Sequence, residues 1–195
     1  MLLVHHRVNS LTQLKEIKID EGVEIDIRSW NSNLILNHEA MEIGEHFEKW
    51  INECQNPLVI LNVKSEGLEE EVLRKIKDSG FEGDYFFLDQ SFPFLVRTLS
   101  GGFTKTALRV SEYESADYLS DLDCQWVWLD SHTGDWSFLP RALSLSKATG
   151  KKTCLASPEL HSREPHQEII QIRSVLSELK IQLDAVCTKT PELWN

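Results

Sequence analysis

The chain has 195 residues, of which 41% are hydrophobic and 26% charged, a composition typical of a globular protein with one sizeable core. Its formal net charge of −11 leaves no excess of lysine and arginine to replace the counterions of a polyanion, which argues against nucleic acid or an anionic membrane as a general partner. No apolar run approaches the roughly 18 residues of a membrane span, and the four cysteines lie far apart with no CxxC pair. We therefore expect one cytoplasmic domain over residues 1–195, without a transmembrane segment. Three of the four cysteines fall in or beside apolar runs, and we expect them to act as small buried hydrophobes. The sequence does not indicate an oligomeric state.

Short apolar runs alternate with amphipathic segments along the chain. The runs, several of them rich in β-branched or aromatic residues, predict strands at residues 2–4, 23–27, 58–63, 85–88, 106–110, 125–129, 152–156 and 183–187. Apolar residues three and four apart predict helices at 11–17, 43–51, 68–79 and 169–179, the third of which ends at Gly80. Residues 92–99 and 116–122 predict two short helices, and the segment after Pro191 predicts about one final turn.

About eight strands with helices between them match an α/β fold, a compact TIM (β/α)₈ barrel with parallel strands and no insertion domain. At 195 residues the chain would lie at the lower size limit of that fold, so an open doubly wound sheet with fewer strands is the alternative. Such sheets usually bind their ligand through a glycine-rich first loop. The first loop here, residues 6–10, contains no glycine, and we therefore expect the barrel.

Polar or ionisable side chains close almost every predicted strand. In a barrel these positions face one mouth, and because such groups are costly to bury unpaired, a metal ion or an anion would explain them. These residues are His6, Arg7, Glu24, Asp26, Arg28, His38, Glu39, Asn62, Lys64, Asp89, Arg109, Ser111, Glu112, Asp130, His132, Ser157, Glu159, His161, Thr188 and Lys189.

Glu24 and Asp26 are two positions apart on the second predicted strand and therefore share one of its faces, while the apolar residues of the run take the other. Two adjacent carboxylates repel each other unless one is protonated or a cation bridges them, and oxygen ligands suit Mg²⁺ or Ca²⁺. The pattern indicates a divalent-cation site. The alternatives are a solvated face of an edge strand, or salt bridges to Arg7 and Arg28.

Two histidines and two cations accompany these carboxylates. His6 and His38 offer an acid and a base that titrate near neutral pH, although each alone is compatible with an ordinary hydrogen-bonded histidine. Arg7 and Lys64 can clamp a phosphate group or form ordinary salt bridges.

The order of these motifs resembles the glycerophosphodiester phosphodiesterase family, within the phosphatidylinositol-phospholipase-C-like phosphodiesterase superfamily. The motifs are His-Arg at residues 6–7, Gly-Val-Glu-Ile-Asp-Ile at 22–27, Leu-Asn-His-Glu at 36–39 and Leu-Asn-Val-Lys at 61–64, and residues 184–191 are similar to the family's closing strand. The resemblance implies a TIM barrel, a divalent cation (Mg²⁺ or Ca²⁺) and cleavage of a phosphodiester. By matching positions it implies an acid–base pair of His6 and His38, metal ligands Glu24, Asp26 and the residue at position 62, and phosphate contacts Arg7 and Lys64.

The chain departs from the family's pattern at several positions. The glycine after His-Arg is Val8, the aspartate after the second histidine is Glu39, and the glutamate of the third strand is Asn62, which can coordinate a cation but adds no charge. Asn9 is a further candidate ligand, because an asparagine near the first histidine is a ligand in the related phospholipases C. The insertion that the family carries after the second histidine is missing.

The sequence thus predicts a metal-dependent phosphodiester hydrolase that acts on a small or saccharide-linked phosphodiester. One alternative is a non-catalytic relative that binds a phosphorylated ligand, which Asn62 favours; another is a barrel isomerase or aldolase for sugar phosphates with Lys64 or Lys189 as its reactive amine. Trp136 can line one side of the substrate site or pack in the core. The candidate substrate contacts are Arg109, Glu112, Asp130, Glu159 and Trp136.

Overall fold

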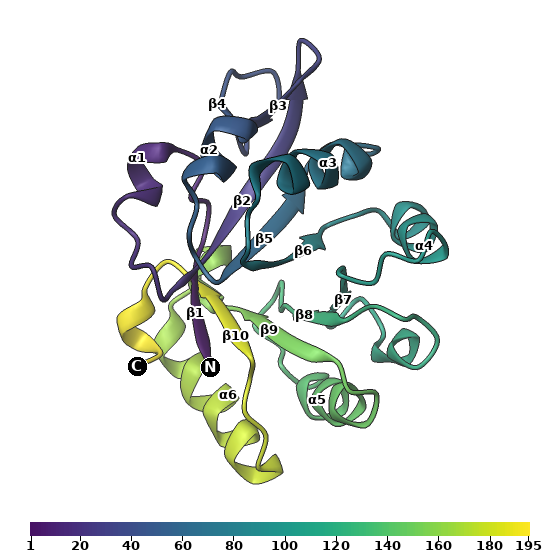
Figure 1. The fold of residues 1–195 in the computed structure, drawn as a ribbon. Coiled ribbons are helices and arrows are strands. Elements are labelled where there is room, and N and C mark those ends of the chain that lie inside the picture. The colour runs from purple at the N-terminus through teal and green to yellow at the C-terminus, as the bar shows by residue number, and fades with distance from the viewer. The chain divides into compact units, whose positions relative to one another are not determined.

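The computed structural model describes residues 1–195, which divide into two compact units. We call residues 5–95 the N-terminal unit, and residues 1–4 together with 96–195 the C-terminal unit. In each unit strands alternate with helices along the chain, as the sequence pattern predicts (Figure 1). None of the helices combines the length and the apolar character that crossing a membrane requires.

Parallel strands form the centre of the N-terminal unit. Strand β2 (Gly22–Trp30) pairs in parallel with β5 (Leu58–Val63), and β5 pairs in parallel with β6 (Asp84–Leu88). The later part of β2 pairs antiparallel with β3 (Asn33–Leu36), which in turn pairs with β4 (Glu45–His46). The helices are α1 (Leu11–Leu14), α2 (Phe47–Glu53), α3 (Glu69–Ser79) and α4 (Phe92–Ser100), the last of which continues into the C-terminal unit.

Four consecutive parallel strands build the C-terminal unit: β7 (Ala107–Val110), β8 (Trp126–Leu129), β9 (Lys152–Ala156) and β10 (Ala185–Thr188). Strand β1 (Leu2–His5) begins beside β10, where the amide of Leu2 donates to the carbonyl of Asp184 at 2.8 Å. The other elements are the 3₁₀ helices η1 (Ala116–Leu119), η2 (Pro158–His161) and η3 (Pro191–Leu193), and helices α5 (Leu139–Ala148) and α6 (Pro165–Leu179). Helix α5 packs against β8 and β9 and contacts α6 (Figure 1).

The burial of the strands confirms the apolar-run prediction. Every residue of β5 and β8 is buried, as expected for parallel strands that are covered on both faces. Helix α3 ends where predicted, because Gly80 adopts a left-handed conformation (φ 69°) that a residue with a side chain rarely takes. All four cysteines are buried and free, which confirms the role in the core that was expected of three of them.

The predicted helix over residues 43–51 is wrong in its first turn. A Cβ atom on Gly44 would lie 2.1 Å from the carbonyl oxygen of Leu36, so the chain passes β3 at a distance that only glycine permits. The next two residues form β4, and the helix therefore begins at Phe47, leaving Ile43 exposed. Helix α5 was not expected from the sequence, and the helix expected at residues 116–122 is the shorter 3₁₀ helix η1.

Candidate active site

The pairing of β2 with β5 brings three polar side chains of the N-terminal unit together. Asp26 and Asn62 are direct neighbours in the register of the two strands, and the Asn62 Nδ2 atom donates to Glu24 Oε1 at 2.9 Å. Glu24 and Asp26 are 0% exposed, and Asn62 is 6% exposed. The alternative of a solvated face is therefore wrong, and the buried carboxylates need a partner that neutralises their charge.

The chain between β1 and β2 encloses the carboxylate of Glu24. Arg7 adopts a left-handed conformation (φ 59°), and its backbone N–H donates to Glu24 Oε2 at 2.7 Å. The Nε2 atom of His6 lies 3.9 Å from the same oxygen. Burial, together with the charge of Asp26, raises the pKa of Glu24 from an ordinary value of 4.5 to about 8, against the lowering effect of its hydrogen bonds with Asn62 and Arg7.

Asp26 lies between two cationic side chains. Arg7 Nε is 3.8 Å from its Oδ2 atom, and Lys64 Nζ is 3.5 Å from its Oδ1 atom. Asn9 donates from Nδ2 to Oδ2 and accepts the backbone N–H of Asp26 at Oδ1, both at 2.8 Å. The amide oxygen of Asn9 already accepts a hydrogen bond from the backbone of β2. The contacts of Asn9 therefore favour a role in orienting Asp26 over a role as a cation ligand. Lys64 also pairs with Asp89 at 3.4 Å, a partner that no local pattern in the sequence indicates.

Arg28 holds the second histidine in place. Its Nη2 and Nε atoms donate to the carbonyl of His38 at 2.7 and 3.2 Å, and its Nη1 atom donates to the carbonyl of Lys64 at 3.3 Å. The guanidinium of Arg28 thus binds backbone carbonyls and does not form the salt bridge to the carboxylates that was the alternative to a cation site. His38 Nδ1 pairs with Glu39 Oε1 at 2.6 Å, and its side chain is 35% exposed. The sequence did not reveal this role of Arg28, because its targets come from two different segments.

The oxygen atoms of this cluster are suited to a divalent cation. Oδ1 of Asp26 and Oδ1 of Asn62 are buried and accept no hydrogen bond. Together with Glu24 they form a set of oxygen donors, the type of ligand that Mg²⁺ and Ca²⁺ prefer. These residues therefore fit the metal that the family resemblance implies.

Two of the predicted substrate contacts, Arg109 and Asp130, belong to a second cluster of charged side chains, which lies in the C-terminal unit. Arg109 Nη1 donates to Asp130 Oδ2 at 2.5 Å, and the other oxygen, Oδ1, lies 2.7 Å from His161 Nε2. Burial raises the pKa of Asp130, but the hydrogen bond to His161 and the charge of Arg109 lower it further, so the net shift is downward. The sequence predicts His161 only as a polar residue at a strand end, because nothing in the local sequence pairs it with a residue 31 positions earlier.

The other three predicted substrate contacts have partners within the C-terminal unit. Glu112 accepts hydrogen bonds from the backbone of residues 132 and 133, and Glu159 accepts from Ser157 and Thr188. Trp136 is 7% exposed and donates from Nε1 to Glu168 at 2.8 Å, an arrangement that favours packing in the core. Contact of any of them with substrate stays a prediction.

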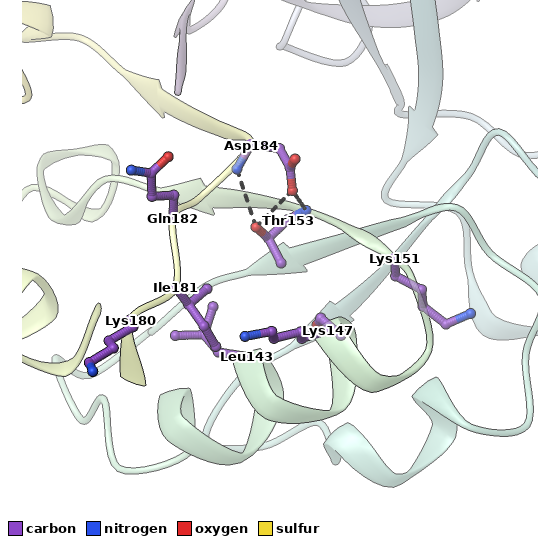
Figure 2. A pocket seen from close by; sticks show the side chains of 9 residues that line it. Leu143, Lys147, Lys151, Thr153, Lys180, Ile181, Gln182 and Asp184 are labelled. Carbon is purple, nitrogen blue, oxygen red and sulfur yellow. Dashed lines mark hydrogen bonds between the residues drawn. The ribbon is translucent and has the colours of Figure 1, made fainter. Parts of the chain in front are cut away.

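The C-terminal unit contains a cavity of about 250 Å³ (Figure 2), and none of the predicted site residues is among those that line it. It sits at the amino-terminal ends of β9 and β10, where Asp184 accepts hydrogen bonds from the backbone and hydroxyl of Thr153. Three lysines line it: Lys147, Lys151 and Lys180. Barrel enzymes use the opposite, carboxyl-terminal ends of their strands, so this cavity is not the candidate active site.

Solved structures share this fold over almost the whole chain. A glycerophosphodiester phosphodiesterase from Parabacteroides distasonis is 13% identical and matches 98% of this chain and 93% of its own, with a TM-score of 0.66. A glycerophosphodiester phosphodiesterase from Thermotoga maritima is 14% identical and matches 99% of this chain and 96% of its own, also with a TM-score of 0.66. The chain has the fold of the glycerophosphodiester phosphodiesterases. Since these enzymes are TIM barrels, the predicted fold class is confirmed, and so is the predicted resemblance at the level of the fold.

The structural similarity establishes the fold of the chain but not the reaction that it catalyses. A chain of the tryptophan synthase complex from Pyrococcus furiosus, 14% identical, also matches 96% of this chain and 85% of its own with a TM-score of 0.51. No family model and no curated protein sequence matches the chain. Because one barrel fold serves many reactions, the function must be argued from the residues of the site.

Proposed function

We propose that this protein is a metal-dependent phosphodiester hydrolase of the glycerophosphodiesterase type, acting in the cytoplasm on a small or saccharide-linked phosphodiester. The observation that carries the proposal is the fully buried pair Glu24 and Asp26, with His6 Nε2 3.9 Å from one carboxylate and Lys64 3.5 Å from the other. The fold shared with glycerophosphodiester phosphodiesterases supports the same reaction class.

The proposed cation ligands are Glu24, Asp26 and Asn62, with Asn9 orienting Asp26 or adding a ligand. A bound Mg²⁺ or Ca²⁺ would supply positive charge that polarises a non-bridging oxygen of the phosphate. The raised pKa of Glu24 supports this assignment, because burial and the charge of Asp26 disfavour a second negative charge here, and a bound cation would offset both effects.

The chain's own residues perform the proton transfers and bind the phosphate. One histidine of the pair His6 and His38 removes a proton from the nucleophile, which is water or a hydroxyl group of the substrate beside the phosphate, and the other protonates the leaving alkoxide. Arg7 and Lys64 neutralise charge that develops on the phosphate oxygens. If a substrate hydroxyl attacks, the first product is a cyclic phosphate.

The second candidate function is binding of a phosphorylated ligand without turnover. Asn62 favours it, because an amide in place of a third carboxylate weakens the hold on a cation. Arg7 and Lys64 also lie 3.8 and 3.5 Å from Asp26 and can offset its charge without any metal. The barrel isomerase or aldolase is less well supported, because Lys64 Nζ lies 3.5 Å from Asp26 and 3.4 Å from Asp89, an arrangement that an ordinary ion pair explains.

The test is hydrolysis of bis(p-nitrophenyl) phosphate and of glycerophosphodiesters with Mg²⁺, with Ca²⁺ and with EDTA. We expect turnover that requires a divalent cation and stops with EDTA. Turnover that is insensitive to EDTA would contradict the proposal. No turnover, with phosphate or metal binding retained, would support the non-catalytic binding function, and a lysine adduct trapped by borohydride would support the isomerase or aldolase.

Replacing Asn62 with aspartate is expected to tighten Mg²⁺ or Ca²⁺ binding by about tenfold, or about 1.4 kcal/mol, because it adds a third negative charge beside Glu24 and Asp26. Isothermal titration of the cation into wild type and Asn62→Asp measures this change. The exposed Asn33→Asp is the matched control and should bind as wild type does. Unchanged affinity in Asn62→Asp would show that position 62 does not contact the cation.

Replacing Arg28 with alanine is expected to lower the free energy of unfolding by about 2 kcal/mol, since three charged hydrogen bonds to two partly buried backbone carbonyls are lost. If these bonds also position His38, kcat will fall more than KM rises. Arg28→Lys keeps the charge, but its compact ammonium group cannot replace a guanidinium that binds two segments. Urea unfolding and steady-state kinetics on both variants measure these effects, and full activity in Arg28→Ala would rule out the positioning role.

A further inference from the structure

A second cluster of metal-ligating groups lies in the C-terminal unit, built from residues that the proposed function does not use as ligands. Asp130 directly follows β8, His132 lies two residues further on, and His161 ends η2. One ligand atom from each lies within 4.8 Å of the others. His161 Nε2 is 2.7 Å from Asp130 Oδ1, and the two imidazole rings are 5.2 Å apart in an edge-on arrangement.

Asp130 is oriented toward the histidines by its other contacts. The carboxylate is 3% exposed, and its Oδ2 atom accepts hydrogen bonds from Arg109 at 2.5 Å and from Trp128 Nε1 at 3.4 Å. Oδ1 is therefore left facing His161. Residues that fix the orientation of a ligating carboxylate in this way are a regular feature of metal sites.

The backbone of His132 is fixed on both sides of the residue. Its N–H donates to Glu112 Oε2 at 3.2 Å, and its carbonyl accepts from Arg163 Nη1 at 3.3 Å. The loop is thus held where the exposed His132 ring contacts His161. An ion pair of Asp130 with His161 would need only those two side chains. The third group, the His132 imidazole, lies on a loop that is fixed beside them, and this third ligand is what points to a metal site.

We propose that Asp130, His132 and His161 bind a transition-metal ion, with Zn²⁺ as the best match. Two imidazole nitrogens and one carboxylate oxygen form a common ligand set for Zn²⁺, whereas Mg²⁺ and Ca²⁺ prefer oxygen ligands alone. The ion would take the place of the hydrogen bond between His161 and Asp130. Three protein ligands leave the fourth position of a tetrahedral site open to water or to an anion.

Zinc titration with a competing chromogenic chelator, in excess Mg²⁺ to fill the oxygen site of the N-terminal unit, tests this proposal. We expect one equivalent of Zn²⁺ to bind to wild type and also to Asp26→Asn. His132→Ala and His161→Ala should each weaken zinc binding by at least about tenfold. Removing a residue that only hydrogen-bonds to a metal ligand already costs about that much affinity, and these two histidines are the proposed ligands themselves. Since His132 is exposed, its removal should leave the fold intact, which a thermal melt verifies.

His166→Ala is the matched control, because His166 is an exposed histidine of α6 that pairs with Glu164. It should bind zinc as wild type does. The proposal is overturned if wild type shows no saturable zinc binding, if His132→Ala binds as tightly as wild type, or if His166→Ala loses as much affinity as His132→Ala. Cobalt in place of zinc gives a second readout, since its visible absorption should change on loss of either imidazole.

Discussion

Replacing His6 with alanine is expected to lower kcat/KM for phosphodiester hydrolysis by about 10²- to 10⁴-fold, the usual contribution of one general acid or base. His6 Nε2 lies 3.9 Å from the carboxylate of Glu24, and its side chain is 10% exposed, so it is held against the proposed cation site. The loss should be in kcat more than in KM, because the proton moves in the transition state. Hydrolysis of bis(p-nitrophenyl) phosphate with saturating divalent cation measures the effect.

His5 provides the matched control for this substitution. It is the preceding residue, but its Nε2 atom is bound to Glu21 Oε2 at 2.6 Å, outside the cluster of Glu24 and Asp26. His5→Ala should therefore keep nearly the full rate. Equal losses in the two variants would point to a general effect on the fold, and an active His6→Ala would remove His6 from the mechanism.

The pKa of Glu24, raised to about 8 by burial and by Asp26, is expected to make the metal-free protein lose stability as the pH rises from about 5 to 8. In this window the folded chain keeps the Glu24 proton while the unfolded chain has released it, so the folded state binds more protons and stability falls with pH. The slope reaches at most about 1.4 kcal/mol per pH unit. It disappears above about pH 8, where both states are ionised.

Urea unfolding of wild type and Glu24→Gln between pH 5 and 9, in EDTA, isolates this contribution. Glutamine keeps the shape of the side chain and a carbonyl acceptor for Asn62 but cannot ionise. The free energy of unfolding of wild type, measured relative to the variant, should therefore fall as the pH rises to about 8. Added Mg²⁺ or Ca²⁺ should reduce the fall, because the cation binds the ionised folded form. Glu164→Gln, at an exposed carboxylate, is the control, and a difference between wild type and Glu24→Gln that is independent of pH would contradict the shift.

Much of the fold follows from local sequence patterns. The strands at residues 58–63 and 152–156 and the helix that ends at Gly80 were predicted correctly, because apolar runs and a left-handed cap residue are read from neighbouring residues alone. The exceptions depend on contacts distant in sequence. Helix α2 starts late because Gly44 passes against Leu36, and nothing within residues 43–51 indicates that approach.

The candidate site was predictable in its composition but not in its contacts. The two-residue spacing of Glu24 and Asp26 was sufficient to place both on one face, and the structure shows both fully buried. The hydrogen bonds of Arg28 to two backbone carbonyls and the pairing of His161 with Asp130 join segments 10 to 36 residues apart. Such pairings depend on how strands align in the folded sheet, which side-chain patterns within one segment do not encode.

The central claim, that the cluster around Glu24 and Asp26 cleaves phosphodiesters with a divalent cation, is tested most directly by phosphorus NMR of glycerophosphodiesters incubated with the protein. The method separates the diester, the monoester and a cyclic phosphate in one spectrum. We predict that a monoester or cyclic phosphate resonance grows with Mg²⁺ or Ca²⁺ for wild type, and is absent with EDTA and for Asp26→Asn. A diester signal that stays unchanged while wild type binds the cation would contradict the account.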